Sequence, residues 1–382
     1  MNNNPLIELE KLGQSIWVDF LGRDALDNGE LQRMIAQDGV SGLTSNPSIF
    51  EKSIMETKSY DSAINALARA GKSVKEMVMV LTVADIQRAA DLFRPVYDQM
   101  EGNDGYVSLE LTSTLARDTA GSIAEARVLW KAVNRPNLFI KVPGTRPGLP
   151  VIQQLIGEGI NVNITLLFGL PRYREVAGAY LAGLESLAAS GQKPLSQMAS
   201  VASFFLSRID TLIDPQLEKI QQAGGPNAET AGRLRGQIAT ASAKVAYQMY
   251  NEIFNSERFL KLKSLGARPQ RLLWASTSTK NPEYSDVKYI EPLIGRDTIN
   301  TVPVETLAVY RDHGKPGLSL EDGVQAAVQV LEDLKKVGIS LDQVTQQLED
   351  EGVAKFNKST EQLNAGLEKK RAALTSSDKV RS

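Results

Sequence analysis

The sequence predicts an α/β protein whose strands close into a (β/α)8 TIM barrel with additional helices. Short strand-like runs alternate with helical stretches along nearly all of the 382 residues. Eight such runs can be placed, and eight parallel strands are the number that closes this barrel. The main alternative is an open doubly wound sheet, which would favour a G-x-G-x-x-G turn after the first strand, and none follows it there.

The expected strands are apolar runs rich in β-branched and aromatic residues, several of them bounded by proline or glycine. They are placed at residues 16–20, 42–46, 105–111, 138–145, 160–167, 198–205, 271–276 and 299–302. Helices are expected at about 29–37, 74–100, 118–133, 149–157, 171–189, 208–222, 229–254, 320–337 and 341–373, with shorter ones after Pro47 and near Glu305. We interpret residues 1–382 as a single barrel domain with extra helical insertions and a C-terminal helical extension.

Composition excludes several chemistries. The chain has no cysteine and one histidine, His313, which lies in a polar segment and is expected to be a solvated loop residue. Thiolate nucleophiles, a Ser-His-Asp triad and the common metal sites are therefore not expected, and no metal or cofactor is predicted. The net charge of −2 favours neither nucleic acid nor an anionic membrane as a partner. Without a recognisable signal peptide or long apolar run, a soluble cytoplasmic protein is expected.

Polar side chains recur at every second residue of several expected strands. Strands of a parallel barrel are buried on both faces, so unbroken apolar runs would be the ordinary pattern. The alternating sets are Trp17 and Asp19, Thr44 and Asn46, Ser108 and Glu110, Phe139 and Lys141, Asn161, Asn163 and Thr165, and Ser203 and Phe205. Their placement predicts a polar lumen at the C-terminal end of the barrel, where barrel enzymes carry their active sites. Hydrogen-bonded or water-filled packing is the alternative.

Lys141 lies in the middle of the apolar run Leu138-Phe139-Ile140-Lys141-Val142. Burying an ammonium group is costly unless it is paired or loses its proton. A solvated lysine on an edge strand is the plain alternative. In a polar lumen, a lysine shielded from water can attack a carbonyl as the free amine and form an iminium. The iminium is an electron sink that makes cleavage of the neighbouring carbon–carbon bond feasible.

Carboxylates and amides on neighbouring strands suit the proton transfers of such a reaction. Glu110 could reach the lysine region through a water held by Thr165, and Asp19 could take a proton from a substrate hydroxyl. Asn46 and Asn163 can hydrogen-bond sugar hydroxyls. For each carboxylate alone, a strand-end cap or a salt bridge is the competing interpretation.

A second group of residues suits an anion. Arg208 follows the sixth strand at a helix start, where backbone N–H groups add positive potential. Hydroxyls and a lysine, Ser276-Thr277-Ser278-Thr279-Lys280, follow the seventh strand. Adjacent strand ends of this kind form the usual phosphate pocket of the barrel. A Ser/Thr-rich surface loop is the alternative.

Taken in order, these segments resemble the transaldolases. The resemblance covers about residues 5–310, and its opening and overall length are similar to the longer bacterial subgroup. The matching segments are Trp17-Val18-Asp19, Leu43-Thr44-Ser45-Asn46-Pro47, Glu110, Ile140-Lys141-Val142-Pro143-Gly144-Thr145, Asn161 to Phe168, Ser203-Phe204-Phe205 with Arg208, and Trp274-Ala275-Ser276.

The resemblance implies an enzyme of the pentose phosphate pathway that moves a dihydroxyacetone unit from a ketose phosphate to an aldose phosphate. The donors would be sedoheptulose 7-phosphate or fructose 6-phosphate, and the acceptors glyceraldehyde 3-phosphate or erythrose 4-phosphate. It implies Lys141 as the Schiff-base former, Glu110 with Thr165 as a water-mediated proton shuttle, and Asp19 as the acid/base. It also implies ketose contacts at Thr44, Asn46, Asn163, Ser203 and Phe205, and phosphate contacts at Arg208, Ser276, Ser278 and Lys280.

The chain departs from the family pattern in one place. Shorter transaldolases have an arginine two residues after the phosphate-binding serine, and here that position is Ser278. We therefore predict that Lys280 substitutes for this arginine. Small aldolases of the same superfamily resemble the chain less, because they are much shorter and have glutamine where Glu110 stands.

Three other functions remain open at this point. The chain could be an aldolase that releases free dihydroxyacetone, a retaining glycosidase that uses Asp19 and Glu110, or a sugar-phosphate-binding protein without catalysis. Small sugar phosphates are the expected partners, without nucleic acid or membrane. The sequence leaves both a monomer and a homodimer open.

Overall fold

The computed structural model describes residues 4–381, with side chains described up to residue 374. Within this range, eight parallel strands pair in chain order and β8 pairs with β1, which closes the barrel. The predicted (β/α)8 TIM barrel is therefore confirmed, and none of these strands has a free edge. The strands are β1 (Gln14–Asp19), β2 (Val40–Thr44), β3 (Val107–Glu110), β4 (Leu138–Pro143), β5 (Val162–Leu167), β6 (Ser200–Phe205), β7 (Arg271–Ala275) and β8 (Thr298–Val302).

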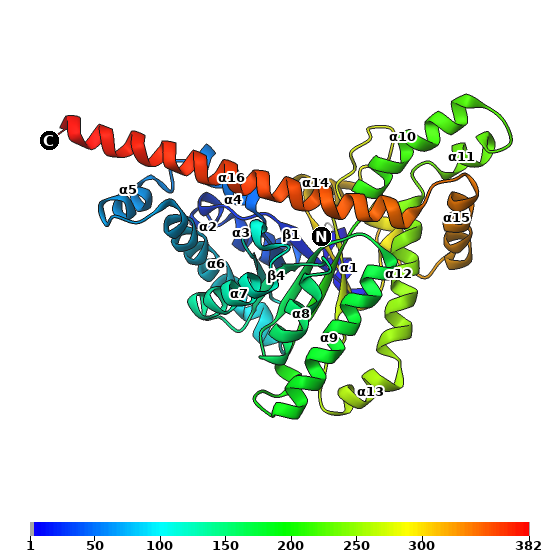
Figure 1. Cartoon of the computed structure of the whole chain (residues 1–382), viewed down its shortest axis with the longest axis horizontal. Helices are drawn as coiled ribbons and strands as arrows, with labels where there is room; N and C mark the ends of the chain where they lie inside the picture. Colours follow the sequence, from blue (N-terminus) through cyan, green and yellow to red (C-terminus); the bar gives the residue numbers. More distant parts are fainter. Residues whose placement is uncertain (1–3, 382) are drawn as a thin grey trace.

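Helices surround the barrel and fill the connections between its strands (Figure 1). In the described range, none of them is long and apolar enough to cross a membrane. They are α1 (Pro5–Lys11), α2 (Arg23–Asp27), α3 (Glu30–Asp38), α4 (Pro47–Glu56), α5 (Asp61–Arg69), α6 (Val74–Gln99), α7 (Thr119–Val133), α8 (Gly148–Gly157), α9 (Leu170–Ser190), α10 (Ser207–Ala223), α11 (Ala228–Leu234), α12 (Ile238–Phe254), α13 (Glu257–Ser264), α14 (Val304–His313), α15 (Val324–Lys336) and α16 (Leu341–Arg381), with 3-10 turns η1 (Ser113–Leu115), η2 (Leu195–Gln197) and η3 (Glu291–Leu293).

The prediction of a single helix at 229–254 is wrong, because the helix is interrupted between α11 and α12. Gly236 has a φ of +66°, a left-handed conformation that favours glycine and cannot continue a helix. The Gly236 N–H donates to Asp214 Oδ1 at 2.8 Å, and the Ala239 N–H donates to Asp210 Oδ1 at 2.8 Å. Carboxylates of α10 therefore accept from the backbone at the start of α12, which a one-dimensional pattern does not reveal.

Aromatic side chains locate the inward face of the strands. The rings of Trp17 on β1 and Phe139 on β4 lie with centroids 6.2 Å apart, although these strands are not neighbours. The two side chains can meet only inside the barrel. Because strand side chains alternate with a period of two, Asp19 and Lys141 point to the same interior, one step nearer the C-terminal end.

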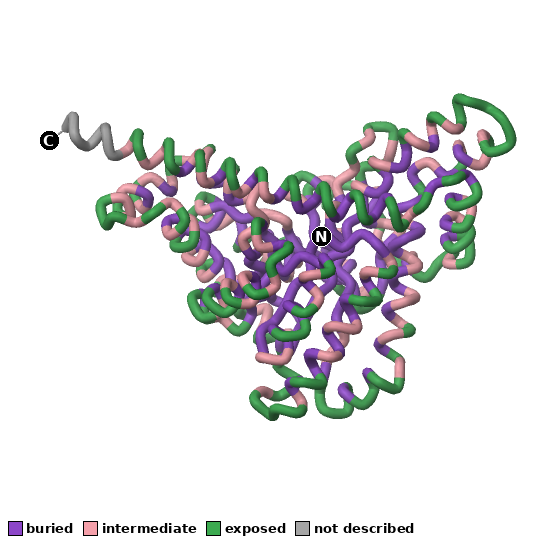
Figure 2. The backbone as a smooth tube through the Cα atoms, viewed as in Figure 1, coloured by how far each residue is buried: buried purple, intermediate pink, exposed green. Residues whose placement is uncertain are grey.

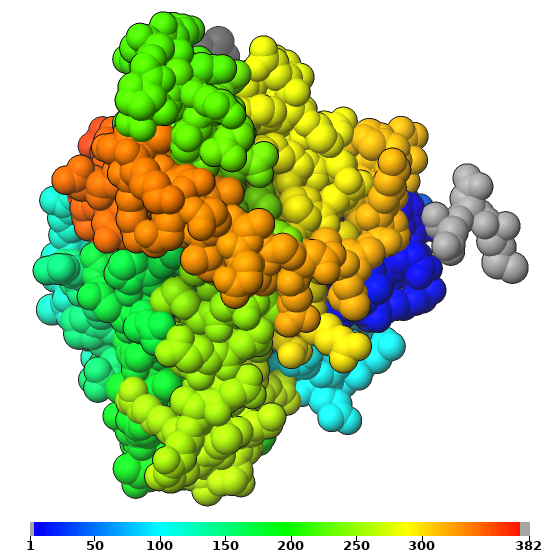
Figure 3. Space-filling view, turned by 90° about the vertical axis from the view of Figure 1, so that its right-hand side faces the viewer, coloured from blue at the N-terminus to red at the C-terminus, as the bar shows by residue number. Residues whose placement is uncertain are grey.

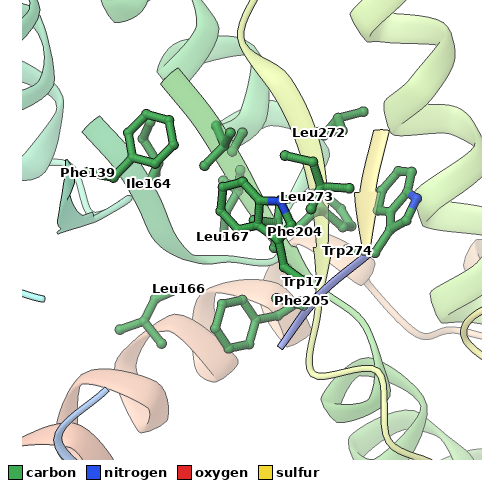
Figure 4. Packing of buried hydrophobic residues seen from close by; sticks show 14 of the residues in the cluster. Trp17, Phe139, Ile164, Leu166, Leu167, Phe204, Phe205, Leu272, Leu273 and Trp274 are labelled. Carbon is green, nitrogen blue, oxygen red and sulfur yellow. The ribbon is translucent and has the colours of Figure 1, made fainter. Parts of the chain in front are cut away.

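Apolar side chains fill the barrel interior away from its C-terminal end, and they fill the layer between the strands and the helices. Side chains of β1, β4, β5, β6 and β7 gather in this core (Figure 4). Burial is concentrated along the strands, while the outer sides of the helices are exposed (Figure 2). Helix α15 packs against α12 on the outer surface (Figure 3).

The last helix, α16, crosses the C-terminal end of the barrel (Figure 1). It packs against α4, α10, η1 and the β5 strand, and the first three follow the C-terminal ends of β2, β6 and β3. Hydroxyl pairs join it to this end: Ser359 lies 2.7 Å from Ser48, and Thr360 lies 2.8 Å from Ser113. The predicted C-terminal helical extension is thus present. The assignment of the whole chain to a single domain stays a prediction.

Candidate active site

Lys141 is enclosed within the barrel. The residue is 4% exposed, and its Nζ donates to the Ser45 carbonyl oxygen at 3.1 Å. Nζ also lies 3.3 Å from Glu110 Oε2, in an ion pair with both side chains at most 5% exposed. The alternative of a solvated lysine on an edge strand is excluded by this burial and by the closed sheet. One amine is thus held where water is scarce.

Glu110 stands directly beside Lys141 in the register of β3 and β4. Burial raises the pKa of the Glu110 carboxyl to about 7; the Lys141 charge opposes this rise and the Asp19 charge adds to it. Among the described residues, Glu110 Oε1 and Thr165 Oγ1 are buried without a hydrogen-bond partner. A carboxyl with a pKa near neutrality is suited to both accepting and donating a proton.

Asp19 is held at the end of β1 by a chain of hydroxyls. Thr44 Oγ1 donates to Asp19 Oδ1 at 2.7 Å and lies 2.9 Å from Thr301 Oγ1. These residues come from β1, β2 and β8, which are neighbours in the barrel. The hydrogen bond leaves Asp19 Oδ2 for a ligand, and it fixes the direction in which that oxygen points.

The two predicted amide side chains differ in how far the protein itself engages them: both polar groups of Asn163 are hydrogen-bonded, and one group of Asn46 is. Asn163 donates from Nδ2 to Ser108 Oγ at 2.9 Å, and its Oδ1 accepts from Ser203 Oγ at 2.7 Å. Asn46 is the N-cap of α4 and accepts from the Ile49 N–H at 3.1 Å through Oδ1. Its Nδ2 group therefore remains to donate to a ligand.

The predicted anion site lies at the ends of β6 and β7. The Arg208 guanidinium lies 5.5 Å from the centre of the Phe205 ring, and burial lowers the pKa of Arg208. Ser276 has a φ of +54°, an uncommon conformation for a residue other than glycine. Lys280 Nζ donates to Ser278 Oγ at 2.5 Å. Positive charge and hydroxyls therefore converge at one end of the site.

One cavity of about 170 Å³ joins the lysine to this anion site. Its lining combines carboxylate, amide, hydroxyl and cationic groups at the C-terminal ends of the strands. Among the predicted site residues, those that line it are Asp19, Thr44, Asn46, Lys141, Ser203, Phe205, Arg208, Ser276, Ser278 and Lys280. Glu110 and Asn163 are not in this set; Glu110 contacts the lining residue Lys141, and Asn163 contacts the lining residue Ser203. Thr165 pairs with Pro143 in the register of β4 and β5.

Comparison with known proteins identifies the family. The sequence model described as Transaldolase/Fructose-6-phosphate aldolase matches residues 16–367. The chain belongs to this family. It is 46% identical over 381 residues to a transaldolase of Trichodesmium erythraeum (strain IMS101), covering 98% of this chain and 100% of that protein. It is 47% identical over 373 residues to a transaldolase of Thermobifida fusca (strain YX), covering 97% and 100%.

Family membership and geometry together support an enzyme of the transaldolase type, while the role of each residue stays a prediction. Among the described residues, no group of three or more His, Cys, Asp or Glu side chains could hold a metal ion. His313 is the last residue of α14 instead of a loop residue; it is exposed, and its ring bonds to Asp286 and Asp312. It does not line the cavity.

Asn161 belongs to the polar set on the fifth strand but serves the backbone. Its Nδ2 donates to the carbonyl oxygens of Pro136 and Leu138, both at 3.3 Å, and its Oδ1 accepts from the Ala199 N–H at 3.0 Å. The residue precedes β5 and crosslinks the start of three strands, away from the transaldolase cavity. Position along the strand, and not polarity alone, separates this structural asparagine from Asn163.

Five residues of the cavity lining were not among the predicted site residues: Ala275, Thr277, Thr301, Pro303 and Phe356. Thr301 lies on β8, and its polar character in an expected strand was a usable signal. Phe356 comes from α16 and lines the same cavity. An apolar residue in an amphipathic helix predicts burial but not the partner, so nothing in the local sequence placed Phe356 at the mouth of the transaldolase barrel.

Proposed function

We propose that this enzyme transfers a dihydroxyacetone unit between sugar phosphates through a Schiff base on Lys141. The observation that carries the proposal is the buried Lys141 amine, 3.3 Å from a carboxyl whose pKa is raised to about 7. An amine at such a site has what a carbonyl addition needs: a nucleophile, a proton carrier and little competing water. Full-length relatives named transaldolase support the same reaction.

The proposed reaction begins with attack of Lys141 Nζ on C2 of the ketose. The carbinolamine loses its hydroxyl as water and an iminium forms. Glu110 supplies the proton for this step through a water held by Thr165. Asp19 then removes the proton of the C4 hydroxyl. The C3–C4 bond breaks, its electron pair flows into the iminium to give an enamine, and an aldose leaves.

The second half reverses these steps with a new partner. The enamine carbon attacks the aldehyde carbon of an acceptor aldose phosphate, and Asp19 returns the proton to the new hydroxyl. Water, deprotonated by Glu110, then hydrolyses the iminium and frees Lys141. All atoms and electrons are supplied by the two sugars, water and these side chains, so the proposed reaction needs no cofactor.

Sugar phosphates fit the two ends of the cavity. Asn46 and Ser203 offer neutral polar groups toward the sugar, and Arg208 with Lys280 offers positive charge toward a phosphate. We propose sedoheptulose 7-phosphate or fructose 6-phosphate as donor and glyceraldehyde 3-phosphate or erythrose 4-phosphate as acceptor. We also propose that the enzyme acts in the pentose phosphate pathway and in the cytoplasm.

The test is borohydride reduction of the protein mixed with fructose 6-phosphate, followed by intact and peptide mass. We expect a stable adduct with the mass of a reduced three-carbon unit on the Lys141 peptide. Lys141→Met should lose the adduct. Lys193→Met is the matched control, because Lys193 is a partly buried lysine near Trp130, outside the cavity. No adduct in the folded wild type would instead favour a sugar-phosphate-binding protein.

A second assay separates transfer from simple aldol cleavage. With fructose 6-phosphate and erythrose 4-phosphate together, we expect sedoheptulose 7-phosphate as the product. An aldolase would release free dihydroxyacetone at the same rate with or without the acceptor. A retaining glycosidase would remain active in Lys141→Met, so full activity of that variant on a glycoside would refute the Schiff-base proposal.

A further inference from the structure

One face of α16 is turned toward the cavity mouth. A Cβ atom placed on Gly352 would lie 3.7 Å from Arg208 Nη1 and 2.8 Å from Leu166 Cδ2, so the helix backbone passes close to both residues. Phe356, one turn later, lines the cavity. Lys355 lies three residues after Gly352, and helix residues spaced by three and four share a face. Lys355 therefore lies on the side of α16 next to Phe356; it is exposed and is not part of the cavity lining.

Positive charges converge at this place. The charges of Arg208 and Lys280, together with burial, lower the pKa of Lys355, and the Arg208 charge is the largest cause. Among the side chains that the structure describes, none of these three cations forms an ion pair with a carboxylate. The charges of Glu110, Asp19 and, more weakly, Glu351 on the same helix oppose the lowering of the Arg208 pKa by burial. Three cations held against their mutual repulsion are stabilised when an anion lies between them.

The position of α16 is set by contacts on both sides of Lys355. Arg117 pairs with Asp350 at 2.7 Å, and Arg172 pairs with Glu349 at 3.3 Å. Beyond the mouth, Ser359 contacts Ser48 in α4 at 2.7 Å. Anchors on either side keep the intervening turn over the cavity, so the position of this turn beside Arg208 belongs to the folded barrel.

We propose that Lys355 of α16 binds the phosphate group of the sugar substrates together with Arg208 and Lys280, and selects phosphorylated over unphosphorylated ketoses. This inference rests on the proposed function and adds a residue from outside the (β/α)8 barrel to its binding site. It also assigns a task to the C-terminal extension. A phosphate carries several acceptor oxygens, and the three cations can each contact a different one.

The experiment measures the affinity of the intact protein for inorganic phosphate by calorimetry, independently of turnover. We expect Lys355→Met to raise the dissociation constant for phosphate about fivefold, which is the loss typical of an exposed charged contact. Lys358→Met is the matched control, because it removes the same charge from an exposed site on the same helix. It should change the constant less than about twofold, and Lys355→Arg should retain most of the affinity.

Kinetics give the second readout. Lys355→Met should raise KM for fructose 6-phosphate about fivefold with little change in kcat, and leave kcat/KM for unphosphorylated fructose unchanged. Equal effects of Lys355→Met and Lys358→Met, or no phosphate binding by the wild type, would overturn the assignment. If phosphate binds as expected but no sugar is cleaved or transferred, the proposed function fails while the phosphate contact stands.

Discussion

Replacing Glu110 by glutamine tests whether the carboxyl beside Lys141 titrates near neutrality. Burial raises its pKa from 4.5 to about 7. Between these values the folded protein holds a proton that the unfolded chain has released. Stability contributed by the proton-bound carboxyl is therefore fully present below about pH 4.5 and is lost as the pH rises through about 7. Glutamine has nearly the same shape and does not titrate.

The size of the effect follows from the pKa difference. A shift of about 2.5 units, the difference between the values of 4.5 and about 7, is worth about 3.4 kcal/mol at most, because one unit corresponds to about 1.4 kcal/mol. About 2.5 kcal/mol of this contribution to the free energy of unfolding is lost between pH 5 and pH 8, according to the linkage relation. The wild type should therefore lose about 2–3 kcal/mol more of its free energy of unfolding than Glu110→Gln over this interval.

The assay is urea unfolding of both proteins at pH 5, 6, 7 and 8, followed by circular dichroism. Other buried carboxyls, such as Asp210 with its pKa raised to about 6, titrate in both proteins and cancel in the difference. Glu361→Gln, at an exposed position of α16, is the matched control and should parallel the wild type. If the wild-type and Glu110→Gln curves are parallel from pH 5 to pH 8, the reasoning about the buried carboxyl is refuted.

Three further changes probe the rest of the site and its support. Asp19→Asn keeps the shape but not the base, so kcat should fall about 10²- to 10⁴-fold; an unchanged kcat in steady-state assays would contradict the acid/base role. Asn46→Ala should cost about 1 kcal/mol of stability through the lost cap and raise the donor KM, whereas Asn46→Ser should restore only the stability in urea unfolding. Gly42→Ala would place a Cβ atom 2.3 Å from Trp17 Cε2, so unfolding should show a loss of about 1–3 kcal/mol, with a changed near-UV spectrum; native stability would disprove that contact.

The strand interior illustrates what local pattern can determine. Alternation placed Asp19, Lys141 and Ser203 on one face because the side-chain period of a strand is fixed at two, whatever surrounds it. Closure of eight parallel strands then brings the C-terminal ends together, so the same side chains must line one cavity. The same rule does not separate Asn161 from Asn163, because alternation specifies a face and not the depth along the barrel axis.

Other features depend on contacts between distant segments. The capping bond of Asn46 could be foreseen from Asn-Pro at a helix start, but the raised pKa of Glu110 depends on complete enclosure. The break before α12 depends on carboxylates of α10. In each of these cases the deciding atoms lie on another element, and their approach is not encoded in the spacing of nearby residues.

By itself, the sequence determined the barrel and the strand ends at which the polar side chains lie, because these follow from periodicities of the chain; the lysine-centred chemistry is a prediction from the same residues. Only the tertiary structure decided that α16 lies over the cavity and that Phe356 lines it. An amphipathic helix specifies that one face is buried but not which surface covers it. That choice is made by the fit of the helix against α4, α10 and the end of β5.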